Sequence, residues 1–518
     1  MLAQMLAQML AQTSSQLPPL QTPKVEYSAF VPELILLGAA LLLLLVASLV
    51  RTRPRKGTYA TYTVVAALAA LVASWLSWRH VLHHGPYGAV SDAIAVDGFT
   101  CFMFVVLSVS VVLGALLADS YLRHEELDGP EFYVLMLLSA AGGMFMATAN
   151  DLIVLFLGLE TLSIALYVLT GFHRARMASR EAAMKYFVLG AFSSALFLYG
   201  VALIYGATGS TNLVEIGGFL ARNVITSDGV LLAGVALLLV GLGFKIAAVP
   251  FHTWTPDVYQ GAPTPVTGFM AAAAKAAGFA GLLRVFFSTF QTLRLDWQPL
   301  IWGLAVLTLL VGSVLAIVQS DIKRMLAYSS ISHAGYVLIG LQAATSSGLA
   351  GSLYYLLAYT FMVLGSFAVV AVVGRRGGEA HALDAYKGLA RTRPGLALAF
   401  TVFLMAQAGI PFTTGFLAKF YVISAAVESR SYALALIGML AAVIAAFFYL
   451  RVIVLMYSSV GEDAAGAEAD TATAATRVRV PGSTGVALAA ALAFTVAFGI
   501  IPAPVIHFAT QASRRLLF

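Results

Sequence analysis

Long apolar stretches separated by short charged segments are the dominant pattern of this chain. The first stretch, LILLGAALLLLLVASLV, lies between Glu33 and Arg51, and the last spans about 485–508. A transmembrane helix needs about 20 consecutive apolar residues, whereas a transmembrane β-barrel needs strands of alternating polarity. The pattern therefore predicts an all-α polytopic membrane protein with about 14 transmembrane helices.

The composition agrees with this prediction and excludes several other classes of protein. Of the 518 residues, 60% are hydrophobic and 10% are charged, whereas soluble proteins carry about 25% charged residues. The single cysteine, Cys101, cannot form a disulfide within the chain and cannot hold an iron–sulfur cluster or a structural zinc by itself. We expect neither a metal nor a redox cofactor in this chain.

Lys and Arg are distributed unevenly among the predicted loops. If the N-terminus lies outside, the inside loops hold most of the loop cations, including Arg51, Lys323 and Arg393. Because positively charged loops stay on the cytoplasmic side, this alternation places both termini outside. We therefore interpret the net charge of +6 as a signal of orientation rather than of nucleic-acid binding.

The chain divides into six predicted segments. The first begins with MLAQ repeated three times, a low-complexity extension to which we assign no function. The segments are an N-terminal extension (1–28), helices 1–3 (29–130), a first repeat of helices 4–8 (131–291), a second repeat of helices 9–13 (292–458), an inside loop (459–484), and helix 14 with a C-terminal tail (485–518).

A weak internal repeat supports the division into two five-helix units. LYVLTG (166–171) is similar to GYVLIG (335–340), and VPFHTW (249–254) is similar to IPFTTG (410–415). Units with an odd number of helices must insert in opposite orientations, which is the inverted-repeat architecture of many transporters. Chance similarity in an apolar sequence remains an alternative.

Four charged residues stand inside the apolar stretches. They are Glu160, Lys245, Lys275 and Lys419. A charged side chain at the centre of a transmembrane helix costs roughly 2.5–3.5 kcal/mol on insertion scales. At a rise of 1.5 Å per residue, Lys275 lies about 18 Å beyond Pro263, the expected helix start. Such residues indicate either a functional pathway or structural ion pairs between helices.

Prolines predict that helices 7 and 12 are broken next to two of these lysines. Pro250 follows Lys245 by five residues, and Pro411 precedes Lys419 by eight. Proline removes a backbone donor and clashes with the preceding turn, and opened backbone persists at membrane depth only where protein or water satisfies it. A hydrated cavity is therefore expected at each break; a plain kink with a snorkelling lysine is the alternative.

Buried lysines can carry protons. Burial favours the neutral amine and a nearby carboxylate favours the charged form, so a lysine with a switchable partner can bind and release a proton. We therefore predict a relay in which Glu160 modulates Lys245, Lys275 is central and Lys419 is last. His252 and His333 are either members of a water path or ordinary polar residues. The sequence shows no nucleotide-binding motif, so the energy must come from a partner or a second ion.

Four stretches of the chain resemble a known family. They are GFKIAAVPFHTWTPDVYQGAPTPVTGFMAAAAKAAGFAGLLR (243–284), FLGLETLSIALYVLTGF (156–172), DIKRMLAYSSISHAGYVLIG (321–340) and QAGIPFTTGFLAKFYV (407–422). These stretches are similar to the antiporter-like membrane subunits of proton-pumping NADH–quinone oxidoreductase (respiratory complex I). The PDVYQGAP…K motif is typical of the N-type members.

The resemblance implies roles for particular residues. Glu160 and Lys245 match the ion pair of helices 5 and 7, Lys275 matches the relay lysine of helix 8, and Lys419 matches the terminal residue of helix 12. His333 matches a polar position of helix 10 on the water path.

The resemblance also implies a setting in the bacterial plasma (inner) membrane. FMN, iron–sulfur clusters and quinone are expected in partner subunits, and an M-type subunit and small membrane subunits are expected as neighbours. The alternatives are a subunit of a multisubunit cation/proton antiporter and a purely structural membrane subunit.

Overall fold

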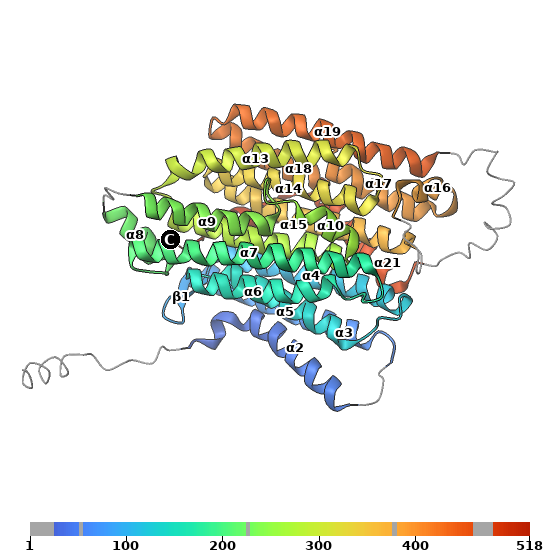
Figure 1. The fold of residues 1–518 in the computed structure, drawn as a ribbon, viewed down its shortest axis with the longest axis horizontal. Coiled ribbons are helices and arrows are strands. Elements are labelled where there is room, and N and C mark those ends of the chain that lie inside the picture. Colours follow the sequence, from blue (N-terminus) through green and yellow to red (C-terminus); the bar gives the residue numbers. More distant parts are fainter. Residues whose placement is uncertain (1–24, 51–54, 224–227, 375–380, 459–479, 518) are drawn as a thin grey trace, which may run out of the picture.

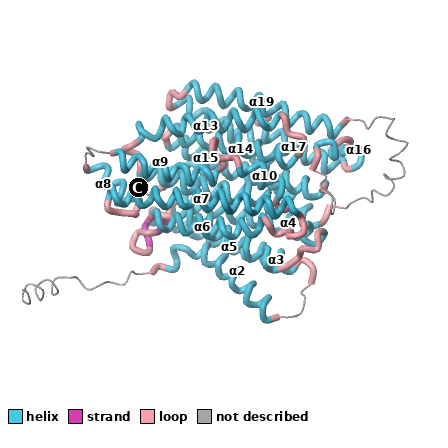
Figure 2. Tube along the Cα trace, viewed as in Figure 1, coloured by secondary structure: helices cyan, strands magenta, loops and turns pink. Residues whose placement is uncertain are grey.

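The computed structural model describes residues 25–50, 55–223, 228–374, 381–458 and 480–517. The MLAQ repeats and most of the predicted inside loop 459–484 lie outside these residues. Within the described part, Figure 2 shows helix almost throughout. Besides the helices and the loops that connect them, there is a small antiparallel hairpin of β1 (Tyr87–Ala89) and β2 (Ile94–Val96), which the all-α prediction did not include.

Among the described residues, 12 helices are long and apolar enough to cross a membrane. The first, Tyr27–Leu49, begins with a 3-10 turn, η1 (Tyr27–Phe30), and the eighth, Thr264–Thr289, combines α-helical and π-helical segments. The others are single α-helices. The spans are α2 (Val31–Leu49), α3 (Thr58–His84), α4 (Gly98–His124), α5 (Pro130–Thr148), α6 (Leu152–Thr170), α7 (Met177–Thr208), α9 (Gly229–Ile246), the eighth helix with α11 (Thr264–Phe269), η2 (Met270–Ala274), α12 (Lys275–Arg284) and η3 (Val285–Thr289), α13 (Arg294–Ile317), α15 (Ser346–Val373), α19 (Tyr432–Tyr457) and α21 (Gly482–Ile500).

The remaining helices connect or complete these spans. The predicted last span of about 485–508 is wrong, because α21 ends at Ile500 and a separate helix begins at Ala503, after Pro502. The remaining elements are α8 (Leu213–Arg222), α10 (Trp254–Gly261), α14 (Ile322–Ala343), η4 (Leu383–Tyr386), α16 (Leu389–Thr392), α17 (Pro394–Ala408), α18 (Thr414–Glu428) and α22 (Ala503–Arg514).

The long helices lie side by side in one elongated bundle, with α2 and α19 on opposite flanks (Figure 1). The eighth helix is buried along its whole apolar window, and α14 and α15 are buried along most of their length. The flanking helices keep apolar side chains exposed, such as Leu41 of α2 and Val443 of α19. An apolar outside around a polar-containing centre is what a lipid environment requires.

Two sets of backbone hydrogen bonds recur at opposite ends of the bundle. Leu152 N donates to Thr211 O and Leu213 N donates to Asn150 O, at the beginnings of α6 and α8. At the beginnings of α14 and η4, Ile322 N donates to His381 O and Leu383 N donates to Ser320 O. All four positions are displaced by the same 170 residues, since 322 − 152 = 170. Figure 1 shows α8 at one end of the bundle and α16, which follows η4, at the other.

The chain is interrupted at both prolines that predicted a break. α9 ends at Ile246 and α10 begins at Trp254, with Pro250 between them. α17 ends at Ala408 and α18 begins at Thr414, with Pro411 between them. The backbone opened at the first break finds a partner, because Val249 N donates a 3.0 Å hydrogen bond to Thr308 Oγ1.

Candidate functional site

Lys245 lies in the last turn of α9, directly before the first break, and is only 4% exposed. Its Nζ donates hydrogen bonds to Ser163 Oγ of α6 (2.7 Å) and to Tyr186 OH of α7 (3.3 Å). Gly278 of α12 makes room for this side chain, since a Cβ at Gly278 would lie 3.2 Å from Lys245 Cγ. The lysine stem therefore packs directly on the helix that begins with Lys275.

The ion pair between Glu160 and Lys245 that the resemblance implies is not formed. Among the described residues no salt bridge includes Glu160, and its Oε1 is buried without a hydrogen-bond partner. Lys245 reaches α6 at Ser163, three positions further along the helix. Because residues three apart share a helix face, Ser163 stands beside Glu160 and takes the amine in its place.

A small cavity adjoins the amine of Lys245. Its volume is about 10 Å³, and Ser163, Tyr167, Ser193 and Ser194 are among the residues that line it. One water molecule needs about 10–15 Å³ of space for its centre, and it needs polar partners around it. The lysine at the first break therefore has a site for a single water beside it.

Lys275 is the first residue of α12 and directly follows the π-helical turn Met270–Ala274. It is 4% exposed. Its Nζ donates to the hydroxyl of Ser330 (2.6 Å) and to the carbonyl oxygen of the same residue, and lies 5.9 Å from the ring centroid of Tyr359. π-helical turns inside α-helices are frequent at functional sites, and here the turn directly precedes the lysine.

His333 lies on α14, and in the sequence it stands between Lys275 and Lys419. Its Nδ1 is 2.6 Å from Tyr355 OH, and its Nε2 is 3.2 Å from Tyr449 OH. The ring also lies 4.7 Å from the ring of Tyr359, centroid to centroid. Both nitrogens therefore have hydroxyl partners, and the imidazole adjoins the same tyrosine that Lys275 faces.

Lys419 lies on α18 and reaches back across the second break. Its Nζ donates a 2.8 Å hydrogen bond to the carbonyl oxygen of Ala408, the last residue of α17, and lies 4.9 Å from the ring centroid of Tyr336. Gly409 has φ +96°, and a Cβ there would lie 3.0 Å from Lys419 Cδ. The glycine provides both the left-handed turn that ends α17 and the space for the lysine.

Together these contacts form one buried cluster in the second half of the chain. The ring of Tyr336, which faces Lys419, lies 6.3 Å from His333, centroid to centroid. The cluster therefore leads from Lys275 through the rings around His333 to Lys419.

His252 lies apart from this cluster, in the first break. It is half-buried, and its Nδ1 has no hydrogen-bond partner among the described residues. No described hydrogen bond joins it to any of the predicted relay residues. The structure therefore does not bring this predicted water-path residue together with the lysines.

The chain is similar to proteins of known identity over most of its length. Residues 149–445 match the family model described as NADH:quinone oxidoreductase/Mrp antiporter, TM. NADH-quinone oxidoreductase subunit N of Trichlorobacter lovleyi is 46% identical over 82% of this chain and 85% of that protein. Subunit N of Rhodococcus opacus is 41% identical over 95% of this chain and 96% of that protein. The chain belongs to the subunit N family of NADH-quinone oxidoreductases.

A solved structure gives the same result for the fold. The chain is similar to a chain of respiratory complex I from Thermus thermophilus with bound Aureothin, with 32% identity, a TM-score of 0.77, and coverage of 92% of this chain and 99% of that one. The protein is thus a proton-translocating, multi-pass membrane subunit of NADH-quinone oxidoreductase. Membrane subunits of this family lack redox centres, and no cluster of three or more metal-binding side chains occurs in the described part of this one.

The partners of the lysines in this complex I subunit were missed at the sequence level. They are hydroxyl groups and aromatic rings: Ser163, Tyr186, Ser330, Tyr336 and Tyr359. The hydroxyl partners of His333, Tyr355 and Tyr449, were missed as well. The available signals were SSISH (329–333) and YYLLAY (354–359), which concentrate hydroxyl groups within buried apolar helices.

Lys323 was placed wrongly by the prediction. It was assigned to an inside loop, but it is 1% exposed and donates a 2.5 Å hydrogen bond to the carbonyl oxygen of Ala262. Because it is the second residue of α14, its side chain packs against the end of α10 instead of reaching solvent.

Proposed function

We propose that this subunit carries protons along a relay of Glu160, Lys245, Lys275 and Lys419, with His333 between the last two. The observation that carries the proposal is the buried cluster that leads from Lys275 to Lys419. Placing an ionisable side chain inside a membrane bundle costs free energy. Such residues are therefore typical of proton and ion pathways. Four such residues, of which the three lysines are held by hydrogen bonds, support a pathway.

His333 is suited to pass a proton between the lysines. An imidazole can bind a proton at one nitrogen and release one from the other, and here each nitrogen faces a tyrosine hydroxyl. Lys275 donates to Ser330, three positions before His333 on the same helix. Residues three apart share a helix face, so the serine that holds the amine lies on the same face of α14 as the imidazole.

The first half of the relay works through Ser163 and the adjoining cavity. A hydroxyl group both accepts and donates, so Ser163 can hold Lys245 when the amine is charged. The unpartnered oxygen of Glu160 lies on the same helix face. A change in the charge of Glu160 therefore changes the proton affinity of Lys245 without a direct ion pair, and a water in the cavity supplies the exchange partner.

The energy for this movement comes from other subunits. FMN, iron–sulfur clusters and quinone belong to partner subunits of the complex. An M-type subunit and small membrane subunits are the expected neighbours. Quinone reduction changes the electrostatic field at the subunit boundary, and Glu160 is the relay residue that is still partly exposed.

We further infer that the chain has about 14 transmembrane segments. The 12 candidate spans leave out α14, which contains buried polar residues, and the pair α17 and α18, which is divided by the second break. The hydrogen bonds repeated at opposite ends of the bundle support two inverted repeats, helices 4–8 and 9–13. Both termini lie on the outer side of a bacterial plasma membrane.

The proposal is tested in the assembled complex reconstituted into proteoliposomes. The protons translocated per NADH oxidised are measured for Lys275→Ala and for the control Lys56→Ala, which removes an exposed lysine in the segment before α3. We expect a lower ratio for Lys275→Ala and an unchanged ratio for the control. If the number of protons translocated per NADH is unchanged in both variants, the proposal is wrong and the role of this subunit is structural only.

A further inference from the structure

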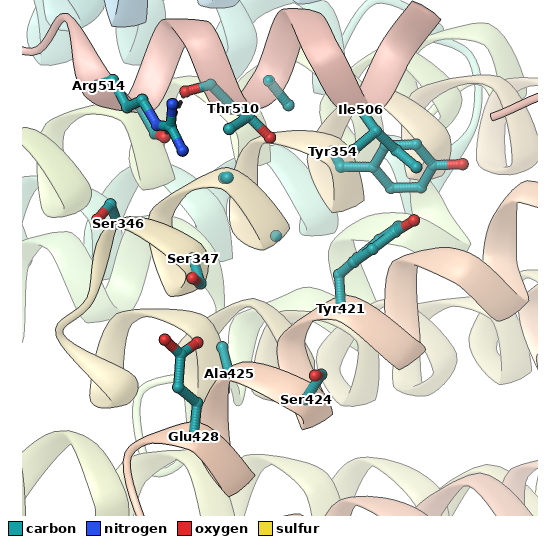
Figure 3. A pocket seen from close by; sticks show the side chains of 14 residues that line it. Ser346, Ser347, Tyr354, Tyr421, Ser424, Ala425, Glu428, Ile506, Thr510 and Arg514 are labelled. Atoms are coloured by element: carbon teal, nitrogen blue, oxygen red, sulfur yellow. Dashed lines mark hydrogen bonds between the residues drawn. The ribbon is translucent and has the colours of Figure 1, made fainter. Parts of the chain in front are cut away.

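A cavity of about 270 Å³ lies near the C-terminal end of the chain, apart from the relay. It is open to the surface and is bordered by the beginning of α15, the end of α18 and the helix α22. Figure 3 shows the side chains that surround it. Most of them are polar, although no relay residue is among them.

Two opposite charges face this cavity without neutralising each other. Figure 3 shows Arg514 of α22 and Glu428 of α18 on opposite sides, with Ser347 between them. No salt bridge in the described part of the chain includes either residue. The cavity therefore offers a cationic and an anionic group at separate positions.

The N-terminus of α15 adds a second site for an anion. Thr345 Oγ1 accepts from Gly348 N, and Thr345 O accepts from Leu349 N, both at 3.0 Å. The N–H groups of Ser346 and Ser347 have no acceptor among the described residues. Free N–H groups at the start of a long helix attract anions, and this helix has 28 residues.

We propose that this cavity binds the headgroup of a phospholipid that carries a phosphate and a primary amine, as phosphatidylethanolamine does. The phosphate is held by Arg514, whose guanidinium fits phosphate oxygens, and by the N–H groups of Ser346 and Ser347. The ammonium group donates to Glu428 on the opposite side. The exposed apolar side chains of α18, including Phe420 and Val427, provide surface for the acyl chains.

Lipid binding to the purified, delipidated complex tests this proposal. Phosphatidylethanolamine and phosphatidylcholine with the same acyl chains are added, and the tightly bound lipid is counted by native mass spectrometry. Because the quaternary ammonium of phosphatidylcholine has no N–H to donate, we expect it to bind about tenfold more weakly. Arg514→Ala and Glu428→Gln are each expected to lower the affinity for phosphatidylethanolamine about tenfold.

Matched variants separate the site from general charge effects. Arg515→Ala removes the neighbouring arginine, which does not line the cavity, and Glu26→Gln removes an exposed carboxylate elsewhere. Both are expected to bind lipid as the unmodified complex does. An excess of inorganic phosphate distinguishes a lipid site from a phosphate site.

Three results would overturn the proposal. They are equal binding of the two lipids, unchanged binding in Arg514→Ala and Glu428→Gln, and displacement of the lipid by phosphate alone. NADH oxidation by each variant shows that the complex has assembled. If a variant fails to assemble, the comparison of the two lipids on the unmodified complex still decides.

Discussion

Lys245 donates its 2.7 Å hydrogen bond to Ser163, three positions along α6 from Glu160. The serine thus holds the amine of Lys245, while no described salt bridge joins Lys245 to Glu160. A direct pair would favour the charged lysine strongly, whereas a hydroxyl partner holds it more weakly and lets it exchange its proton. The contact makes Ser163 a positioning residue of the relay.

Replacing Ser163 by alanine is therefore expected to slow proton pumping. Removing a hydrogen-bond partner from a buried charged group costs about 1–3 kcal/mol, and we expect the pumping rate to fall roughly tenfold. The rate is measured in proteoliposomes, with Thr161→Ala as the control because Thr161 is exposed on the same helix. Ser163→Thr keeps the hydroxyl and should restore the rate. Equal rates in Ser163→Ala and Thr161→Ala would remove the serine from the relay.

The hydroxyl of Tyr355 is expected to matter more than its ring. Tyr355→Phe keeps the packing of the ring but removes the partner of His333 Nδ1, and we expect pumping to slow roughly tenfold, as for a loss of about 1.4 kcal/mol. Tyr133→Phe is the matched control, since Tyr133 is equally buried and its hydroxyl has no partner. Pumping that slows to the same extent in both variants would point to packing and not to proton transfer.

Gly409→Ala is expected to disturb Lys419 without changing any titratable group. The left-handed φ of +96° and the contact of 3.0 Å with Lys419 Cδ both oppose a Cβ, at a cost of about 1–3 kcal/mol. We expect the complex to assemble and to pump fewer protons per NADH. Gly303→Ala is the control, because nothing lies within 4 Å of a Cβ there. Normal pumping by Gly409→Ala would mean that the bond to Ala408 is dispensable.

The stability of the fold is expected to depend on a buried ion pair near the C-terminus. Arg284 holds Asp97 with two hydrogen bonds of 2.9 and 3.0 Å, and both side chains are at most 1% exposed. Removing one partner of a buried pair costs about 3–5 kcal/mol, so Asp97→Ala should lower the thermal unfolding temperature clearly. Leu517 N also donates to Asp97, so the C-terminal residues should become sensitive to proteolysis.

A double variant provides the check on this prediction. Asp97→Ala with Arg284→Leu leaves no unpaired buried charge, so its unfolding temperature should lie above that of Asp97→Ala alone. If the two substitutions instead add their separate effects, the pair does not act as a unit.

The lysines and the breaks could be predicted from the sequence because their signals are local. A charged residue within an apolar stretch and a proline within a helix are visible without knowledge of the fold. Lys275 and Pro250 are examples, and the helix is interrupted around Pro250 as expected. The partners of the lysines are not local, since Lys245 and its partner Ser163 lie 82 positions apart in the sequence.

Other errors have different physical causes. α8 is only 10 residues long and contains charged residues, so it carries no transmembrane signal. The hairpin of β1 and β2 has strands of three residues each, too short to show alternation. Lys323 was misplaced because a charge near a helix end does not reveal whether it faces solvent or the neighbouring helix.

The number of protons translocated per NADH, measured in single and paired variants, tests the central claim most directly. If Lys275, His333 and Lys419 act in series, Lys275→Ala, His333→Ala and Lys419→Ala should each lower the ratio by the same amount. Every pair of these substitutions should then give the ratio of a single one. If a double variant instead lowers the number of protons per NADH by the sum of the two single decreases, the residues do not share one pathway through this subunit.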